Sequence, residues 1–271
     1  MMAILVRLLF AVALYGLSVS PVSAGSVDCG ITPIRVAQYT LGLRYYVENG
    51  QEKGINKDIL DELRKRTGCS FVVQEMPFAR IWADLNSGNL DISMSGVWSA
   101  EREKTLWCAQ TITSKWYALI RSESASSVRS AEDFSANKKL IFGVVRGFTH
   151  GVGHDKWLAK MRQEGRVEES ANIDILAEKL KKGRVDGMFS LPYVYRKHLP
   201  DLQMERQVMI EDWAMDEKDI VGCMMMTKSR FSETEVARWK LIIRQMHGDG
   251  TLKRIFSRYL PADEVKKALN F

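Results

Sequence analysis

The sequence predicts an α/β protein made of two similar lobes, each a mostly parallel sheet flanked by helices. Two stretches, "LNSGNLDISMS" (residues 85–95) and "LKKGRVDGMFS" (residues 180–190), share one skeleton of Leu, Gly, Asp and a closing Ser at equal spacing. Around each stretch, strand-like and helix-like segments alternate with short joints, a pattern typical of parallel sheets covered by helices. We therefore interpret each stretch as a helix, a Gly stop and a strand, used once in each lobe.

The first 24 residues are expected to be a signal peptide rather than part of the fold. Arg7 supplies a positive start, "LLFAVALYGL" (residues 8–17) an apolar run, and "VSA" (residues 22–24) an A-x-A-like cleavage signal. The run is shorter than the ~20 residues that a spanning helix needs. We expect export to the periplasm with cleavage after Ala24, and retention as a signal anchor is the alternative.

The first lobe is expected to alternate strands and helices from its beginning. In order, these are a strand at 31–40, a helix at 55–68, a strand at 69–76, a helix at 78–88 and a strand at 90–96. Both helices end at a Gly, which is the usual residue after a helix C-terminus.

The second lobe repeats this alternation after a polar, Ser-rich stretch at 121–139, which is expected to be a connection. A strand at 140–145, helices at 153–165 and 173–183, and a strand at 184–190 are predicted.

The last part of the chain is expected to return to the first lobe. "IVGCMMMTK" (residues 220–228) is typical of a buried strand, and two helical segments at 232–250 and 251–260 follow it. These helices need a sheet to cover, so the predicted organisation is 25–118 in lobe one, 119–216 in lobe two, and 217–271 back in lobe one. Such a chain crosses twice between its lobes and leaves a cleft between them.

Charge and cysteine content restrict the class of protein. The formal net charge is +6 with both signs interleaved, and no basic run carries aromatic spacing, which argues against nucleic acid. Four cysteines in an exported chain predict two disulfides with three possible pairings, and four buried free thiols are the alternative. None forms C-x-x-C, which argues against a thiol redox enzyme or a zinc knuckle.

Four segments in order give the chain a resemblance to the family 3 extracellular solute-binding proteins, the periplasmic amino-acid receptors of ABC importers. The resemblance runs over residues 34–260. The segments are "GINKDILDEL" (54–63), "LNSGNLDISMSGVWSAEREK" (85–104), "AEDFSANKKLIFGVVRGFTH" (131–150) and "LKKGRVDGMFS" (180–190).

This resemblance implies the type II periplasmic binding fold, with a ligand cleft between two lobes. In that fold the first two strands of lobe one are neighbours, and the returning strand lies beside the strand that carries Cys108. The resemblance therefore implies the disulfides Cys29–Cys69 and Cys108–Cys223, because paired strands bring Cα atoms within the required ~4.4–6.8 Å.

Two serines and one arginine are the first candidates for ligand contact. Ligands of open α/β sheets gather at the carboxyl ends of the strands, where Ser95 and Ser190 are placed. Arg102 follows Ser99, a potential helix N-cap, so its guanidinium is expected beside free N–H groups that favour an anion. The resemblance implies that Arg102 holds a carboxylate through two parallel hydrogen bonds; an exposed arginine paired with a neighbouring glutamate is the alternative.

Further candidates come from the resemblance. Thr149 matches a threonine of the loop that closes over the carboxylate from lobe two, and Phe148 stands where the family has another threonine. Trp98 and either Tyr45 or Tyr46 occupy positions of aromatic walls, with burial in the core as the alternative. Arg80, early in a helix, is a weaker candidate because most arginines are solvated.

One departure from the family bears on the ligand. Receptors for α-amino acids usually offer a carboxylate near Ser190 to hold the ammonium group, but neither Ser190 nor Leu191 is acidic. A buried ammonium without a counter-charge is costly. Either Asp212, Glu75 or another acid substitutes, or the ligand is a carboxylate without that amine.

The expected function is capture of a small carboxylate-bearing ligand by hinge closure and delivery to an ABC importer permease, by a monomer without cofactor. No metal is expected, since His150 and His154 lack a third ligand at recognisable spacing. A periplasmic enzyme of the cyclohexadienyl dehydratase type is one alternative, although no carboxylate is marked as its general acid or base. A ligand-sensing accessory subunit without a transporter is another.

Overall fold

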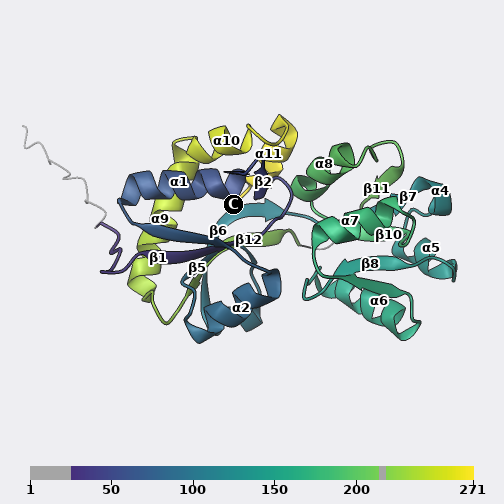
Figure 1. The fold of residues 1–271 in the computed structure, drawn as a ribbon, viewed down its shortest axis with the longest axis horizontal. Coiled ribbons are helices and arrows are strands. Elements are labelled where there is room, and N and C mark those ends of the chain that lie inside the picture. The colour runs from purple at the N-terminus through teal and green to yellow at the C-terminus, as the bar shows by residue number, and fades with distance from the viewer. Residues whose placement is uncertain (1–25, 214–217) are drawn as a thin grey trace, which may run out of the picture.

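The computed structural model describes residues 26–213 and 218–271, and two sheets side by side dominate its architecture (Figure 1). Each sheet has five strands, and helices cover both faces of each. The predicted mixed α/β fold of two sheet-and-helix lobes is confirmed. The expected signal peptide lies outside the described residues, and none of the described helices is long and apolar enough to cross a membrane.

The sheet of the first lobe is built mainly from the N-terminal part of the chain and has the order β4-β1-β5-β12-β6. β1 is parallel to both of its neighbours, whereas the returning β12 is antiparallel to β5 and β6. The bounds are β1 Ile34–Gln38, β4 Phe71–Glu75, β5 Ile92–Val97, β6 Leu106–Ser114 and β12 Ile220–Thr227, and a separate hairpin is formed by β2 Tyr46–Glu48 and β3 Gln51–Lys53.

Alternation of side chains along β1 decides which helix covers which face of this sheet. Ile34 and Val36 belong to the same buried cluster as Ile59 of α1, while Ala37 packs in a second cluster with Ile81 of α2. Helices α1 and α2 therefore cover opposite faces (Figure 1). The helices of this lobe are α1 Ile55–Thr67, α2 Phe78–Ser87, α3 Ala100–Glu103, α9 Glu233–Gly248, α10 Thr251–Phe256 and α11 Ala262–Ala268.

The sheet of the second lobe has the order β11-β7-β10-β8-β9. β8 is parallel to β9 and β10, and β7 is antiparallel to its neighbours β10 and β11. The strands are β7 Tyr117–Arg121, β8 Phe142–Val145, β9 Val167–Ser170, β10 Gly187–Ser190 and β11 Val208–Glu211, and the helices are α4 Ser122–Ala125, α5 Ala131–Ala136, α6 Val152–Gln163, α7 Ile173–Lys181 and α8 Pro192–Asp201.

The Ser-rich stretch at 121–139 differs from the expected plain connection because it contains the short helices α4 and α5. Ser130 and Asp133 form a capping box at the start of α5. Phe134 of this helix is fully buried against the second sheet's core. The polar composition of this stretch therefore did not indicate that Phe134 anchors it to the core.

The repeated Leu-Gly-Asp-Ser skeleton has the structural role that the sequence predicted. Gly88 and Gly183 each follow a helix with left-handed backbone, at φ 74° and 66°. Asp91 and Asp186 then precede β5 and β10, and their carboxylates accept hydrogen bonds from the backbone N–H groups of Arg35 and Ile141, each at 2.8 Å. Each Asp thus ties the start of its strand to the neighbouring strand.

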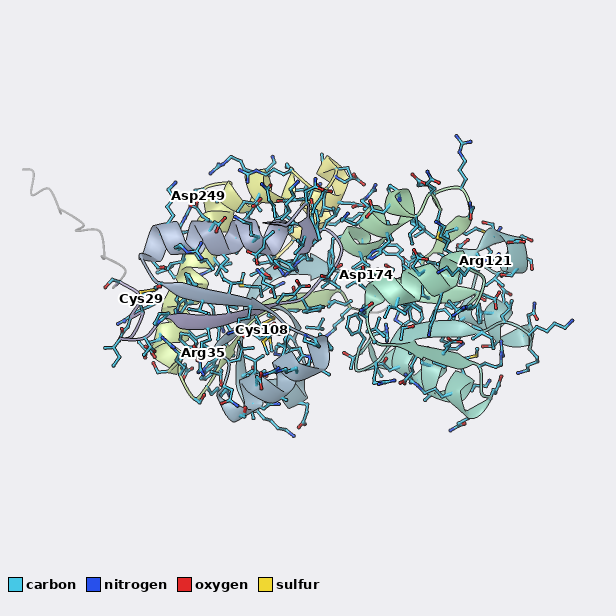
Figure 2. The ribbon with its side chains drawn as sticks, viewed as in Figure 1. Cys29, Arg35, Cys108, Arg121, Asp174 and Asp249 are labelled. Atoms are coloured by element: carbon cyan, nitrogen blue, oxygen red, sulfur yellow. A yellow bond between two sulfur atoms is a disulfide. The ribbon has the colours of Figure 1, made fainter. Side chains whose placement is uncertain are left out.

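Both disulfides implied by the resemblance are present, Cys29–Cys69 and Cys108–Cys223, each with Cα atoms 5.3 Å apart. Cys69 precedes β4, next to β1, and Cys108 of β6 faces the neighbouring β12. Figure 2 places Cys29 at the outer end of the first lobe and Cys108 nearer its centre. Both bonds lie within one lobe, so neither restricts movement between the lobes.

Candidate functional site

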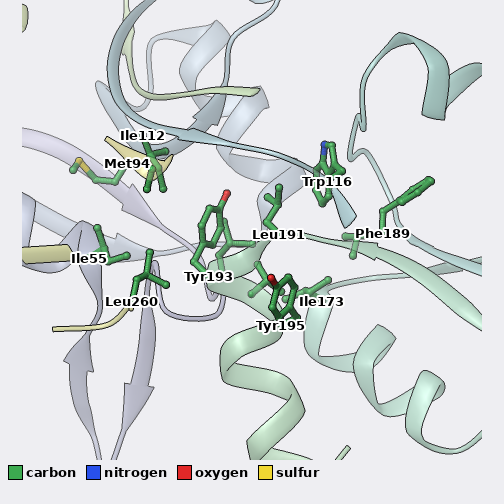
Figure 3. Close-up of a cluster of buried hydrophobic side chains, with 14 of the residues drawn as sticks. Ile55, Met94, Ile112, Trp116, Ile173, Phe189, Leu191, Tyr193, Tyr195 and Leu260 are labelled. Atoms are coloured by element: carbon green, nitrogen blue, oxygen red, sulfur yellow. The ribbon is translucent and has the colours of Figure 1, made fainter. Parts of the chain in front are cut away.

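A cavity lies between the lobes, where strand ends of the first sheet face the second. The room inside it for the centre of a water-sized sphere is about 40 Å³, so the two lobes lie close together around it. Figure 3 shows Ile112, Trp116, Leu191 and Tyr193 gathered in this region from both lobes. The described residues that line the cavity are Tyr39, Leu41, Arg44, Phe78, Ser95, Gly96, Val97, Arg102, Ile112, Ser114, Trp116, Phe148, Thr149, Leu191, Tyr193, Ile220 and Gly222.

Arg102 lines this cavity, as the sequence suggested. Ser99 caps the short helix α3 by accepting a hydrogen bond from the Arg102 backbone N–H at 3.3 Å. The guanidinium donates from Nη1 to the carbonyl oxygen of Val97 at 2.8 Å and lies 3.9 Å from the centre of the Trp82 ring. Burial lowers the pKa of Arg102, yet an arginine remains charged at neutral pH. No described carboxylate pairs with it.

Arg44 is a second guanidinium at the cavity, and sequence reasoning missed it. Its side chain is 2% exposed, with Nε donating to Oδ1 of Asn56 at 2.6 Å and Nη2 to the carbonyl oxygen of Met94 at 2.9 Å. The guanidinium carbon lies 5.5 Å from the centre of the Tyr193 ring in the opposite lobe. Burial lowers the pKa of Arg44, and no carboxylate of the described residues faces it.

Three other candidates also line the cavity, namely Ser95, Thr149 and Phe148. Ser95 lies in the second half of β5, and its hydroxyl accepts a hydrogen bond from Nδ2 of Asn56. Thr149 and Phe148 lie in the loop after β8 and reach the cavity from lobe two. Phe148 packs edge-on against Phe78 of lobe one at 4.7 Å between ring centres, so aromatic rings from both lobes meet at this edge.

Ser190 and Trp98 are placed elsewhere, which corrects the expectation that they face the cleft. Ser190 ends β10 but points into the second lobe, where it is 1% exposed and its hydroxyl has no partner among the described residues. Successive side chains of an extended chain alternate, so Leu191 reaches the cavity instead. Trp98 is 42% exposed, and its backbone N–H donates to the carbonyl oxygen of Val221 at 2.9 Å.

Tyr45, Tyr46 and Arg80 do not line the cavity either. Tyr45 is buried in lobe one, and its hydroxyl donates to Glu52 at 2.7 Å. Tyr46 lies on β2 beneath the amine of Lys197, 4.7 Å away. The Arg80 side chain is 70% exposed and pairs with Asp84 across one helical turn, the commoner fate that the sequence reasoning had weighed.

Four aromatic residues that line the cavity, Tyr39, Phe78, Trp116 and Tyr193, were not anticipated as ligand walls. Tyr39 directly follows β1, and Tyr193, in the first turn of α8, follows β10 by three residues, so both lie just beyond the carboxyl end of a strand. That position is the signal that could have identified them.

Neither acid considered as an ammonium partner lines the cavity. Glu75 accepts a hydrogen bond from the Thr40 hydroxyl at 2.8 Å in a neighbouring hollow, and Asp212 pairs with Lys115 at 2.7 Å. Of the described lining residues, none is Asp or Glu. The acids at 216 and 217 lie outside the described residues.

The two histidines considered for a metal lie in the second lobe. His150 is 3% exposed beside Trp116, with Nδ1 3.3 Å from the Asp155 carboxylate, and burial lowers the pKa of His150. Nδ1 of His154 lies 2.9 Å from the His150 carbonyl oxygen. Within the part of the chain that the structure describes, no three such side chains gather in a way that would hold a metal ion.

The lobes touch beside the cavity through contacts that a separation would break. The Leu43 N–H donates to the Tyr193 carbonyl oxygen at 2.7 Å. Arg196 of α8 forms two charged hydrogen bonds with Glu264 of α11, at 2.5 and 2.6 Å. The structure therefore shows the lobes in contact.

Comparison with known proteins identifies what this arrangement is similar to. A sequence model of the bacterial extracellular solute-binding proteins, family 3, matches residues 34–262. No curated protein sequence matches the chain.

Solved structures share the fold at low identity. The arginine-, lysine-, histidine-binding protein ArtJ of Geobacillus stearothermophilus is 18% identical with a TM-score of 0.69, covering 87% of this chain and 100% of its own. A mutant arginine-binding protein from T. maritima is 16% identical with a TM-score of 0.70, covering 83% and 94%. The ancestral amino-acid-binding protein AncCDT-1, a precursor of cyclohexadienyl dehydratase, is 18% identical with a TM-score of 0.67, covering 84% and 95%.

Proposed function

The chain belongs to the bacterial extracellular solute-binding proteins, family 3, and we propose that it captures a small carboxylate-bearing ligand between its lobes. The observation that carries this proposal is Arg102, a guanidinium at the interlobe cavity without a carboxylate partner among the described residues. A guanidinium matches a carboxylate with two parallel hydrogen bonds. Its stacking on Trp82 and its bond to Val97 fix its orientation before a ligand arrives.

The two-lobed architecture supports capture by hinge closure. Lining residues come from both lobes, so a ligand makes its full set of contacts only when the lobes approach. A ligand shifts an open–closed equilibrium by the difference between its affinities for the two forms. Lys115 and Trp116 link β6 to β7 and form a short crossing at which such a hinge would bend.

The proposed setting is delivery to the membrane permease of an ABC importer from the periplasm, after removal of residues 1–24. Support comes from the family, whose description is extracellular, and from neighbours such as the substrate binding protein of an amino acid ABC transporter. One structural neighbour is a histidine kinase sensor domain. A ligand-sensing role is therefore the alternative if the protein has no permease partner.

We propose that the protein binds without catalysis. Dehydration of the cyclohexadienyl type needs a general acid or base in reach of the ligand. The described cavity lining contains no carboxylate, histidine or lysine, which favours binding alone. Incubation with prephenate or arogenate should give no aromatic product, and its formation at enzymatic rates would establish the alternative.

The proposal is tested by ligand-induced stabilisation and compaction. A compound that binds only the folded state raises the melting temperature, and about 100 times its Kd adds ~2.7 kcal/mol. Small-angle scattering should then show a smaller radius of gyration with that compound present. A saturating ligand that leaves the radius unchanged would contradict hinge closure.

A further inference from the structure

We infer that the cavity selects an organic anion that carries no ammonium group and has an apolar or aromatic body. This inference rests on the proposed function, because it names the ligand class of the same site. Two observations support it, namely the two positive charges at the cavity and the mainly apolar residues that line it.

Two positive charges lie at the cavity from the same lobe. Both guanidiniums donate hydrogen bonds to carbonyl oxygens of β5, Arg102 to that of Val97 and Arg44 to that of Met94. The electrostatic influence of both guanidiniums extends to the same phenol, that of Tyr39. Both therefore act on the same region of the cavity.

No negative charge of the described residues offsets them there. Among the described residues no Asp or Glu pairs with either guanidinium; the phenols of Tyr193 and Tyr39 lie near Arg44, and the phenol of Tyr39 lies near Arg102. Burial raises the pKa of the Tyr39 phenol, so this group is neutral at pH 7. An anion entering the cavity gains two charge-assisted partners, whereas an ammonium group is repelled by both and finds no carboxylate among the described lining residues.

The remaining walls favour an apolar body. Rings line the cavity from both lobes, at Tyr39, Phe78, Trp116, Phe148 and Tyr193. Among the described lining residues, the polar groups other than the two guanidiniums are the phenols of Tyr39 and Tyr193, the indole N–H of Trp116, and the hydroxyls of Ser95, Ser114 and Thr149. Such a lining fixes a carboxylate or 2-oxo acid at one end and covers an aliphatic or aromatic body at the other.

Three pairs of compounds that differ only at C2, where an oxo group replaces the ammonium group, test the inference: phenylpyruvate with L-phenylalanine, 4-methyl-2-oxopentanoate with L-leucine, and 3-methyl-2-oxobutanoate with L-valine. Calorimetry at pH 7 on the mature, oxidised protein measures each Kd. At least one 2-oxo acid is expected to bind, and to bind at least tenfold more tightly than its amino-acid partner. Equal or tighter binding of the amino acid in the best-binding pair overturns the inference, and so does a failure of all three 2-oxo acids to bind.

Leu191 provides a matched pair of variants. It lines the cavity and is the uncapped N-cap residue of α8, a position where Asp and Asn are both favourable. Leu191→Asp places a carboxylate near the two guanidiniums and should reduce the preference for the 2-oxo acid at least tenfold. Leu191→Asn, of the same shape without the charge, should keep the preference. An unchanged preference in a folded Leu191→Asp variant overturns the inference, and if that variant does not fold the wild-type pairs decide alone.

Failure of this inference is distinguishable from failure of the proposed function. An amino acid that binds tightly and compacts the protein would overturn the charge argument and leave the solute-binding function standing. A 2-oxo acid that binds tightly without compaction would overturn hinge closure and leave the ligand class standing.

Discussion

Gly42 lies in the first lobe, against the backbone of Tyr193 and Val194 in the second, and Gly42→Ala should weaken ligand binding by obstructing closure. A Cβ at this position would lie 2.6 Å from Cα of Val194 and even nearer the Tyr193 carbonyl oxygen. Both obstacles are backbone atoms, which cannot move aside as a flexible side chain would. The added methyl group therefore prevents the lobes from reaching their observed contact.

The size of the effect follows from overpacking. Inserting a methyl group into a tight contact costs ~1–3 kcal/mol, and here the cost falls on the closed form alone. Ligand affinity should therefore fall about 5- to 150-fold. Calorimetry with the tightest-binding of the six compounds measures this loss, and scattering should show a larger radius of gyration for the saturated variant than for the wild type.

Gly50→Ala is the matched control for backbone strain. Both glycines have positive φ, 53° at Gly42 and 74° at Gly50, so an alanine is strained at either. Among the described residues, and apart from its two chain neighbours, none has a heavy atom within 4 Å of a Cβ at Gly50. Gly50→Ala should bind like the wild type. Equal affinities for the two variants would refute the claim that this contact belongs to the closed form.

Two further predictions concern stability. Asp91→Asn should lower the free energy of unfolding by ~3–5 kcal/mol, because the side chain of Asp91 is buried and paired with Arg35 and Arg230; a loss below ~1 kcal/mol in chemical denaturation would contradict this. Burial alone would raise the pKa of Asp91, but the hydrogen bonds and charges of both arginines lower this pKa overall. The stabilisation is therefore present above ~pH 3.9 and is lost as the pH falls through the lowered pKa. Asp91→Asn should not show this loss. The native mass should be four hydrogens below the all-thiol mass, and removing Cys108–Cys223 should cost ~2–5 kcal/mol, whereas a free thiol at either position in the native protein would contradict the pairing.

The sequence predicted best those features that depend on local periodicity. Helix α2, Gly88 and strand β5 followed from apolar spacing and a Gly stop, and so did the equivalent unit of lobe two. Strand β9 was missed because its sequence, "VEES", is mostly polar and lies at the edge of the sheet. An edge strand pairs with one neighbour only and can carry charged side chains, so its sequence need not show the apolar alternation by which strands are predicted.

The cavity was predicted less well because single-residue placement decides which side chains line it. Ser190 and Leu191 are adjacent, yet the side chain of Ser190 points into the second lobe and that of Leu191 into the cavity, so an error of one residue is enough to choose the wrong side chain. Arg44 stands directly before Tyr45, a predicted wall, yet only the tertiary fold shows that the arginine reaches the cavity and the tyrosine does not. Arg102 was found because helix capping and the family resemblance agreed on one position.

The central claim, that Arg102 holds the ligand's anionic group, is tested most directly by the Kd of Arg102→Ala against that of Arg80→Ala. Both variants remove an arginine from lobe one, but Arg80 is exposed and does not line the cavity. Truncating one member of a buried charge pair costs ~2–5 kcal/mol, so Arg102→Ala should lose about 30- to 4,000-fold in affinity for the tightest-binding compound, with Arg102→Lys recovering only part. Arg80→Ala should bind like the wild type. Near-normal affinity in a folded Arg102→Ala variant would contradict the account.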